Sequence, residues 1–223
     1  MNASLLNRFI FLCLFIPLHS FANSISTNFD FENIKQSAPV GWTKMGDTSK
    51  YVLSIDKKTA QNGKNSAAIE FTGKSKGFAA WSYRVPAVYQ GAKVTLKGYL
   101  KTENVTDGWA GLWVRIDPKI AFDNMQNRGV TGTTHWQQFE ITLDLNPLNA
   151  QQIVFGGLLI GKGKMWFDNL ELLIDGKPFD KAPSKKRALA YEDKEFDQGS
   201  NIVMPNIDSE LISDLGLLGK VWG

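Results

Sequence analysis

The stretch Asp107–Trp136, DGWAGLWVRIDPKIAFDNMQNRGVTGTTHW, contains the clearest β-strand pattern in this chain. Successive side chains of a strand point to opposite faces, so its first part divides into two sets. One set is apolar and predicts a face that packs on a core: Ala110, Leu112, Val114 and Ile116. The other set combines aromatic rings with a cation: Trp109, Gly111, Trp113 and Arg115. The stretch therefore predicts a half-buried strand over Gly108–Ile116.

Strand patterns of the same kind continue on both sides of this stretch. Apolar and polar residues alternate over Val94–Leu100 and over Phe139–Leu145. Further candidate strands are Tyr51–Ile55, Ser66–Phe71, Gly77–Val85, Gln152–Ile160 and Lys164–Leu173. Turn sequences separate the strands at Asn62-Gly63, Thr72-Gly73, Asp107-Gly108 and Gly161–Gly163. Many short strands and no long amphipathic helix between Phe29 and Ile174 predict an all-β fold, a two-sheet jelly-roll sandwich.

The amino terminus has the parts of a secretory signal peptide. Arg8 precedes an apolar run over 9–17, and small residues follow at Ser20 and Ala22. The run is well short of the roughly 20 residues that a membrane-spanning helix needs. We expect residues 1–22 to be removed, which predicts a secreted or periplasmic protein with no membrane span after cleavage. A short anchor that stays attached is the alternative.

The mature chain lacks the residues of common hydrolase sites. Cys13 and His19 belong to the leader, so His135 is the one histidine in the remaining sequence. Nucleophile systems built on histidine, and histidine zinc sites, therefore have no support. Removing Arg8 from the 25 basic residues leaves 24 against 22 acidic residues, which indicates no nucleic-acid partner. The sequence contains no catalytic constellation, and whether the chain is an enzyme stays open.

The composition changes after Ile174. Residues 176–206 contain three prolines, the basic run Lys185–Arg187 and the acidic stretch Glu192–Asp197, with few large apolar residues. Such a segment predicts an irregular linker, or a strap lying on the sandwich. The jelly-roll domain is therefore expected to span residues 24–175.

Residues 207–223 predict a short C-terminal helix. Asp208 or Ser209 stands at the capping position, and apolar residues recur behind it at helical spacing. These residues are Leu211, Ile212, Leu215, Leu218 and Trp222. The apolar stripe predicts that the helix docks on the sandwich or leads into a further domain.

Several segments have a distinctive residue order. They are NFDFEN at 28–33, GW at 41–42, SIDKKTAQNGKNSAAIE at 54–70, GYLKTENVTDGWAGLWVRID at 98–117, AFDNMQNRGVTGTTHWQQFEITLDL at 121–145 and GLLIGKGKMWFDNLEL at 157–172. This order resembles the galactose-binding-like jelly roll at the amino terminus of some secreted bacterial peptidases and of erythromycin-esterase-like proteins.

The final residues carry a second resemblance. LISDLGLLGKVWG at Leu211–Gly223 resembles the entry into the catalytic half of tail-specific (C-terminal-processing) peptidases, which use a serine and a lysine. Together the two resemblances imply an N-terminal accessory domain of such a peptidase, in a chain that stops before the catalytic domain.

The first candidate ligand site is the aromatic face of the strand Gly108–Ile116. Trp109, Trp113 and Arg115 place aromatic surface beside a cation, which suits a sugar ring or a carboxylate. Packing of these tryptophans under a loop or against the tail is the alternative. Trp81 and Tyr83 share one face of another strand and would extend either arrangement.

The second candidate ligand site is the polar loop that follows. Asp123, Asn124 and Arg128 carry groups that hydrogen-bond sugar hydroxyls. The alternative is a structural loop in which Asp123 caps turn amides and pairs with Arg128.

The resemblance also implies a structural calcium site. In carbohydrate-binding jelly rolls the first and last strands lie side by side, and matching acids hold calcium together with carbonyls of a Gly-Lys turn. The matching positions here are Glu32, Asp168 and the turn Gly63-Lys64, with Lys64 supplying its carbonyl. Calcium takes about six to eight such oxygens. Simple surface acids are the alternative.

We therefore expect a non-catalytic, carbohydrate-binding-like accessory module. Its expected partners are a polysaccharide, peptidoglycan or another extracellular polymer, and a peptidase catalytic domain. One alternative is a purely structural domain that packs on a peptidase partner. The other is a chain that is classed with the serine-type peptidases because of its relatives, or that works as part of such a peptidase by complementation.

Overall fold

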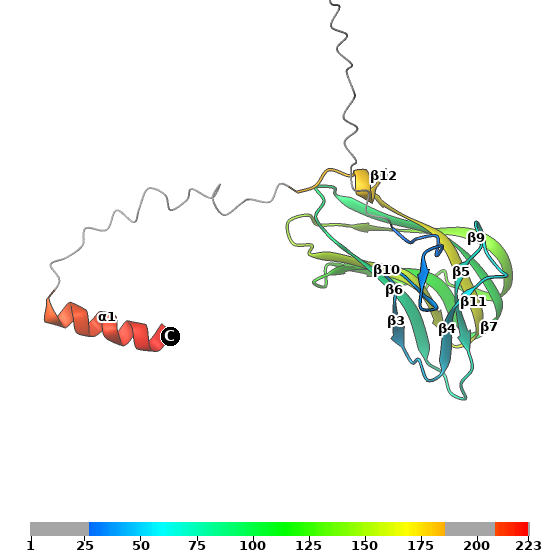
Figure 1. Cartoon of the computed structure of the whole chain (residues 1–223), viewed down its shortest axis with the longest axis horizontal. Coiled ribbons are helices and arrows are strands. Elements are labelled where there is room, and N and C mark those ends of the chain that lie inside the picture. The colour runs from blue at the N-terminus through cyan, green and yellow to red at the C-terminus, as the bar shows by residue number, and fades with distance from the viewer. Residues whose placement is uncertain (1–26, 186–207, 223) are drawn as a thin grey trace, which may run out of the picture. The chain divides into compact units, whose positions relative to one another are not determined.

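The computed structural model describes residues 27–185 and 208–222. The chain divides between Ser184 and Lys185 into two compact units, of which the first contains a β-sandwich and the second contains one helix among its described residues (Figure 1). The strands are β1 (Ile34–Lys35), β2 (Ala38–Pro39), β3 (Thr43–Gly46), β4 (Tyr51–Asp56), β5 (Ser66–Phe71), β6 (Phe78–Pro86), β7 (Lys93–Asp117), β8 (Ala121–Asp123), β9 (Val130–Asp144), β10 (Gln152–Ile160), β11 (Lys162–Ile174) and β12 (Lys177–Pro178). The all-β prediction is confirmed.

The main sheet folds into two layers at a single long strand, β7. The first half of β7 pairs with β9 and β11, and its second half pairs with β8 and β10. The first layer therefore has the order β3-β6-β10-β7-β8, and the second layer has the order β4-β5-β11-β7-β9. All these neighbours are antiparallel.

The chain bends at the predicted turn Asp107-Gly108 but does not reverse there. Asn104 and Asp107 have positive φ angles of 50° and 59°, and the pairing with β9 shifts its register in this region. A Cβ at Gly108 would overlap the carbonyl oxygen of Ile160 on β10. The turn prediction was wrong because these residues form the corner at which one strand passes between layers.

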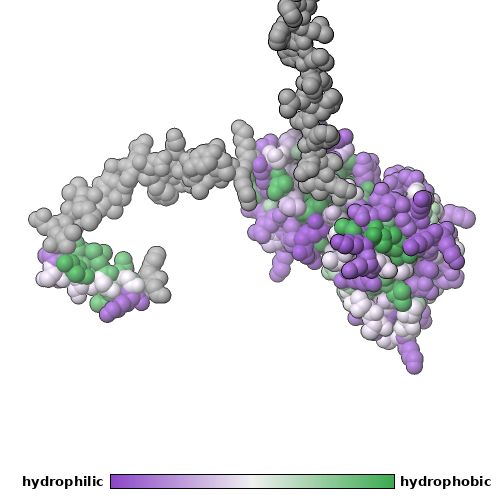
Figure 2. Space-filling model, viewed as in Figure 1, coloured by the Kyte–Doolittle hydropathy of each residue, from purple (hydrophilic) through white to green (hydrophobic). Residues whose placement is uncertain are grey.

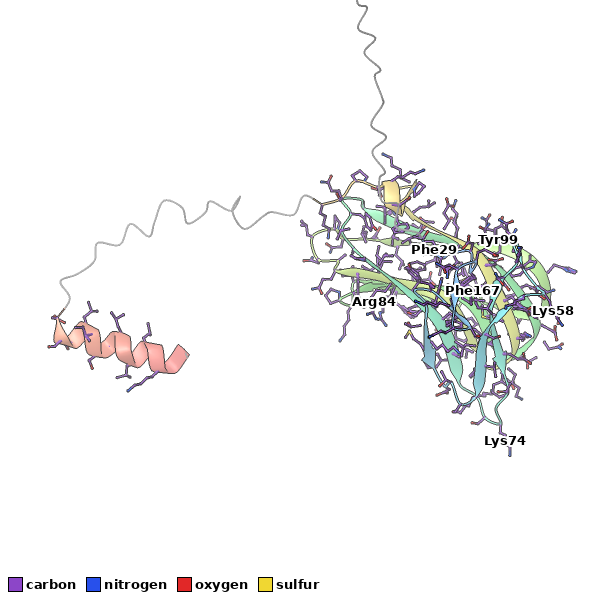
Figure 3. All side chains as sticks on the ribbon, viewed as in Figure 1. Phe29, Lys58, Lys74, Arg84, Tyr99 and Phe167 are labelled. Carbon is purple, nitrogen blue, oxygen red and sulfur yellow. The ribbon has the colours of Figure 1, made fainter. Side chains whose placement is uncertain are left out.

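The core lies between the layers and is built around aromatic rings. Phe155 of the first layer and Phe167 of the second both pack near Trp42, at 6.2 and 5.8 Å between ring centroids. The segment before β1 adds Phe29, which meets Phe155 edge-on at 5.3 Å, and Phe31, which meets Phe167 at 5.1 Å. Figure 3 shows Phe29 and Phe167 inside the sandwich. The first described residues are therefore part of the fold.

The sandwich continues beyond the predicted boundary at residue 175. A short 3-10 helix, Phe179–Lys181, follows β12. Phe179 is only 6% exposed, and its ring lies 5.6 Å from Phe29 and 6.2 Å from Tyr89. The segment up to Ser184 thus lies on the sandwich as a strap, because burial of Phe179 holds it there. Residues 186–206 of the predicted linker and the whole predicted leader lie outside the described residues.

The predicted C-terminal helix is present as α1, Ser209–Trp222. A carboxylate oxygen of Asp208 accepts a hydrogen bond from the Leu211 amide at 2.8 Å, which is the expected cap. Ile212, Leu215 and Leu218 are exposed, and Figure 2 shows apolar residues at the surface of α1. Within the described ranges, no helix has the length and apolar character to cross a membrane.

We predict that Phe179→Ala lowers the free energy of unfolding of the sandwich by about 3 kcal/mol, because it empties an aromatic site in the core. The matched control is Leu148→Ala, since Leu148 is 94% exposed and its loss should stay within about 0.5 kcal/mol. Urea denaturation followed by tryptophan fluorescence measures both. Equal stability of the two variants would show that residues after 175 contribute nothing to the sandwich.

Candidate functional site

A depression of about 330 Å³ lies on the face of the first layer that points away from the core. Leu112 and Val114 of β7 point into the core, so Trp113 and Arg115 point to this outer face. We name it the first-layer depression. Its lining is mostly apolar, with one cation and one amide: Met45, Phe78, Ala80, Trp113, Arg115, Phe122, Asn124, Leu158 and Ile160.

Trp113 forms the floor of this depression. It is 4% exposed and packs in a small apolar cluster with residues of β6 and β10. Its indole nitrogen donates a hydrogen bond to the carbonyl oxygen of Trp81 at 3.2 Å. A Cβ at Gly156 would overlap that same oxygen, so glycine keeps the acceptor in place. Trp113 is therefore a fixed floor with little exposed surface of its own.

The exposed aromatic surface comes from two residues that the sequence did not single out. Phe122 is 59% exposed and Phe78 is 44% exposed, and both line the depression. Phe122 lies on β8, directly opposite Arg115 in the register. The three-residue strand β8 is too short for an alternation pattern, so only the pairing with β7 reveals where Phe122 points.

Trp109 does not itself line the depression, although it contacts Asn124, which does. Its indole nitrogen donates to the carbonyl oxygen of Asn124 at 3.3 Å, and a Cβ at Gly129 would overlap its ring. Trp109 therefore supports the loop between β8 and β9, as the packing alternative expected. Trp81 belongs to the core cluster on the other side of the sheet and the partly buried Tyr83 packs against that cluster, so both extend the packed core and not the depression.

The predicted polar loop divides between two hollows. Asn124 lines the first-layer depression, whereas Asp123 and Arg128 line a neighbouring polar hollow of about 650 Å³ that shares Phe122 and Asn124. Arg128 contacts Asp123 through two nitrogens, at 2.7 and 3.2 Å, and the Met125 amide donates to Asp123 at 2.7 Å. Partial burial raises the pKa of Asp123, but the hydrogen bonds from Arg128 and Met125 hold it below its usual value. The two charges are thus directed at each other.

Arg115 is held at the edge of the depression by Asp117. Its Nε and Nη2 atoms donate to the two carboxylate oxygens at 2.8 and 3.1 Å. The side-chain amide of Gln152 donates to the same carboxylate at 2.7 Å. Burial raises the pKa of Asp117, but these hydrogen bonds and the charges of Arg115 and Arg84 bring it below its usual value. Arg115 therefore has a fixed position.

The structure brings the predicted calcium residues to one loop. Asp168 accepts hydrogen bonds from the amides of Gln61 and Asn62, at 2.9 and 3.2 Å. Glu32 accepts a hydrogen bond from the amide of Lys64 at 2.7 Å. Main-chain N–H groups therefore already donate hydrogen bonds to oxygens of both carboxylates. Among the described residues, no group of three or more His, Cys, Asp and Glu side chains gathers.

Asp168 is fully buried, which raises its pKa to about 6. Hydrogen bonds from the amides of Asn62, Gln61 and Asn169 oppose this shift, and the charge of Glu32 adds to it. The Oε1 atom of Gln61 is buried and has no hydrogen-bond partner in the part of the chain that the structure describes. Each carboxylate oxygen of Glu32 and Asp168 accepts at least one hydrogen bond, so the Oε1 atom of Gln61 is the oxygen of this loop that lacks a donor among the described residues.

The outer face of the second layer has a different character. Lys101 and Lys164 lie over the ring of Trp166, at 5.4 and 4.8 Å from its centroid. The indole nitrogen of Trp166 donates to Asp56 at 2.8 Å. Charged side chains thus cover the aromatic ring on this layer, whereas the first layer exposes aromatic rings.

Comparison with curated proteins gives one clear sequence relative. The chain is 33% identical over 147 residues to a Bacillus subtilis (strain 168) protein named "Uncharacterized HTH-type transcriptional regulator YbfP". The match covers 62% of this chain and 49% of that protein, so the chain spans about half the length of its curated relative. The matched segment has 147 residues, which is more than the residues before 27 and after 185 have together. It must therefore include part of the sandwich. No protein-family model matches the chain.

Solved structures resemble the sandwich at low sequence identity. The enzymatically active domain of bacteriophage CBA120 tailspike protein 4 gives a TM-score of 0.50 at 15% identity, over 68% of this chain and 21% of that chain. The CBM22-1 xylan-binding domain of Paenibacillus barcinonensis Xyn10C gives 0.47 at 15%, over 66% and 91%. TmCBM61 with β-1,4-galactotriose gives 0.45 at 14%, over 66% and 95%. At this identity the likenesses concern the fold alone. The fold is a two-layer jelly-roll β-sandwich, as predicted.

Proposed function

We propose that this protein is a non-catalytic module that binds a carbohydrate or another extracellular polymer on the outer face of the first layer. The first-layer depression carries this proposal. Trp113 gives it a fixed apolar floor, exposed Phe78 and Phe122 stand at its rim, and Arg115 and Asn124 supply polar groups. Apolar surface beside a few fixed polar groups suits a sugar ring, whose C–H face is apolar and whose hydroxyls lie at the edge.

The place of action in this proposal is outside the cytoplasm, secreted or periplasmic. Its support is the leader pattern of residues 1–22, with a basic residue, an apolar run and small residues at the cleavage position. Polysaccharides and peptidoglycan are the polymers available there.

We predict saturable quenching of tryptophan fluorescence by at least one member of a panel of polysaccharides and peptidoglycan fragments. Phe122→Ala should weaken that binding about tenfold, because an aromatic contact contributes about 1 kcal/mol or more. Phe122 is exposed, so its loss leaves the fold intact. Leu148→Ala, at an exposed position outside the depression, is the control and should bind normally. Unchanged affinity of Phe122→Ala would move the site elsewhere, and no binding across the panel would favour the purely structural domain.

A bound calcium ion is the second part of the proposal, with a structural role in the loop before β5. The carboxylates of Glu32 and Asp168, the carbonyl of Lys64 and the side-chain oxygen of Gln61 would hold it. Two observations support this set of ligands. Both carboxylates lie at one loop, and the buried side-chain oxygen of Gln61 lacks a hydrogen-bond partner among the described residues. These are the hard oxygen donors that calcium prefers, and its charge would balance the buried carboxylate.

The raised pKa of Asp168 makes this calcium proposal testable. A carboxyl group with a folded-state pKa of about 6, against 3.8 as its reference, stabilises the fold fully below about pH 4, and this stabilisation is lost as the pH rises to about 6. Calcium binds the ionised form. We predict that added calcium raises the melting temperature by a few degrees at pH 7 and by less at pH 5.

The variant Asp168→Asn should lose both the calcium effect and this part of the pH dependence. The comparison uses melting curves of the full chain with calcium and with a chelator. An equal melting temperature of the unaltered protein in both conditions at pH 7 would mean that main-chain amides alone hold the loop.

The third part of the proposal concerns a peptidase partner. Its support is the resemblance of Leu211–Gly223 to the entry of tail-specific peptidases, together with the exposed apolar residues of α1. The sandwich would act as an accessory domain beside a catalytic domain that carries the serine and the lysine. An immunoblot of the native host should then detect the sandwich in a protein well above the 24.8 kDa of this chain or in a stable complex with such a peptidase. A single free species at or below that mass would contradict this role.

A further inference from the structure

We propose that the first-layer depression selects a carboxylated saccharide over the neutral saccharide of the same linkage, and that Arg84 and Arg115 bind the carboxylate. This inference rests on the proposed function, because it names the chemical class of ligand for the same site.

Two arginines flank one residue of β10 on this face. Val154 pairs with Arg84 of β6 on one side and with Arg115 of β7 on the other. Val154 belongs to the outer cluster with Trp113, so the side chains of this cross-strand row point away from the core. Neighbouring strands lie about 4.8 Å apart, which places the two arginine backbones about 10 Å apart. The two arginines therefore lie on the same outer face, on either side of Val154, and the charges of both act on Asp117, which holds the Arg115 guanidinium.

The charge of this row is unbalanced. Asp117 is the carboxylate that pairs with Arg115, and Gln152 also donates to it. Arg84 influences Asp117 through charge, but its guanidinium forms no hydrogen bond or ion pair within the described ranges. Arg84 is exposed, and Figure 3 shows it at the surface of the sandwich. Two cations thus lie near one protein carboxylate. A ligand carboxylate would balance the charge of the second cation.

The lining of the depression favours the same ligand class. Arg115 and Asn124 are its two polar side chains, and the other lining residues are apolar. A neutral sugar that settles on this surface loses water from several hydroxyls and gains few partners. A sugar acid gains charge-assisted hydrogen bonds from the guanidinium groups while its apolar ring face covers the depression. The carboxylate therefore supplies the affinity that the apolar lining does not.

The test compares matched pairs of ligands by calorimetry with the full mature chain. Oligogalacturonate and oligoglucuronate are each measured against the carboxyl-reduced oligomer, which keeps every linkage and loses only the charge. We expect at least one acid to bind at least tenfold more tightly than its neutral partner in low salt, with a smaller ratio in 0.5 M salt. Arg84→Gln should remove this preference and leave weak binding of the neutral oligomer unchanged. Arg84 is exposed and forms no hydrogen bond or ion pair with the residues that the structure describes, so the substitution should leave the stability of the sandwich unchanged.

Lys97→Gln is the control variant, because it removes a cation from the outer face of the second layer, where Lys97 lies 3.9 Å from Glu140. It should keep the preference for acids. Equal affinity for acid and neutral oligomers, or a preference that survives in Arg84→Gln, overturns the inference and leaves the proposed function standing. Absence of binding by every oligomer also overturns it, and the Phe122→Ala titration then decides the proposed function separately.

Discussion

The continuity of β7 is the constraint on which the rest of the structure depends. One half of this strand lies in the first layer and the other half in the second, so both layers share the same backbone hydrogen-bond ladder. The bend at Asn104 and Asp107 brings the layers face to face, and the aromatic core fills the space between them. Because side chains alternate along β7, closure of the core on one side necessarily directs Trp113 and Arg115 to the other.

The proposed binding face is formed by the residues that β6, β8 and β10 place beside β7. Trp113 is immobilised by the carbonyl of Trp81 and covered by small apolar residues, so it gives shape to the depression and little contact area. The exposed rings of Phe78 and Phe122, and the guanidinium of Arg84, which has no ion pair among the described residues, come from β6 and β8. The proposed recognition on this face thus depends on the assembled layer, because its floor, its aromatic rim and its cationic row combine residues of β6, β7 and β8.

Local alternation predicted the strands, the apolar side of β7 and the outward position of Trp113 and Arg115. It did not reveal that β7 runs through the predicted turn at Asp107-Gly108, because the bend depends on pairing with β9 and β10. Phe122, Arg84 and Phe179 were missed for a related reason. Their roles come from cross-strand partners and core contacts far away in sequence, which no local pattern contains. The capping residue of α1 was predictable because its hydrogen bond spans only three residues.

The central claim is that the outer face of the first layer holds the ligand. The indole N–H signals of the protein, followed by two-dimensional NMR during titration with the tightest-binding saccharide, test it most directly. Trp113 underlies the depression, and Trp166 lies on the outer face of the other layer with its indole bound to Asp56. The account predicts a saturable shift of the Trp113 signal while the Trp166 signal stays fixed. A shift of Trp166 with an unmoved Trp113 would contradict it.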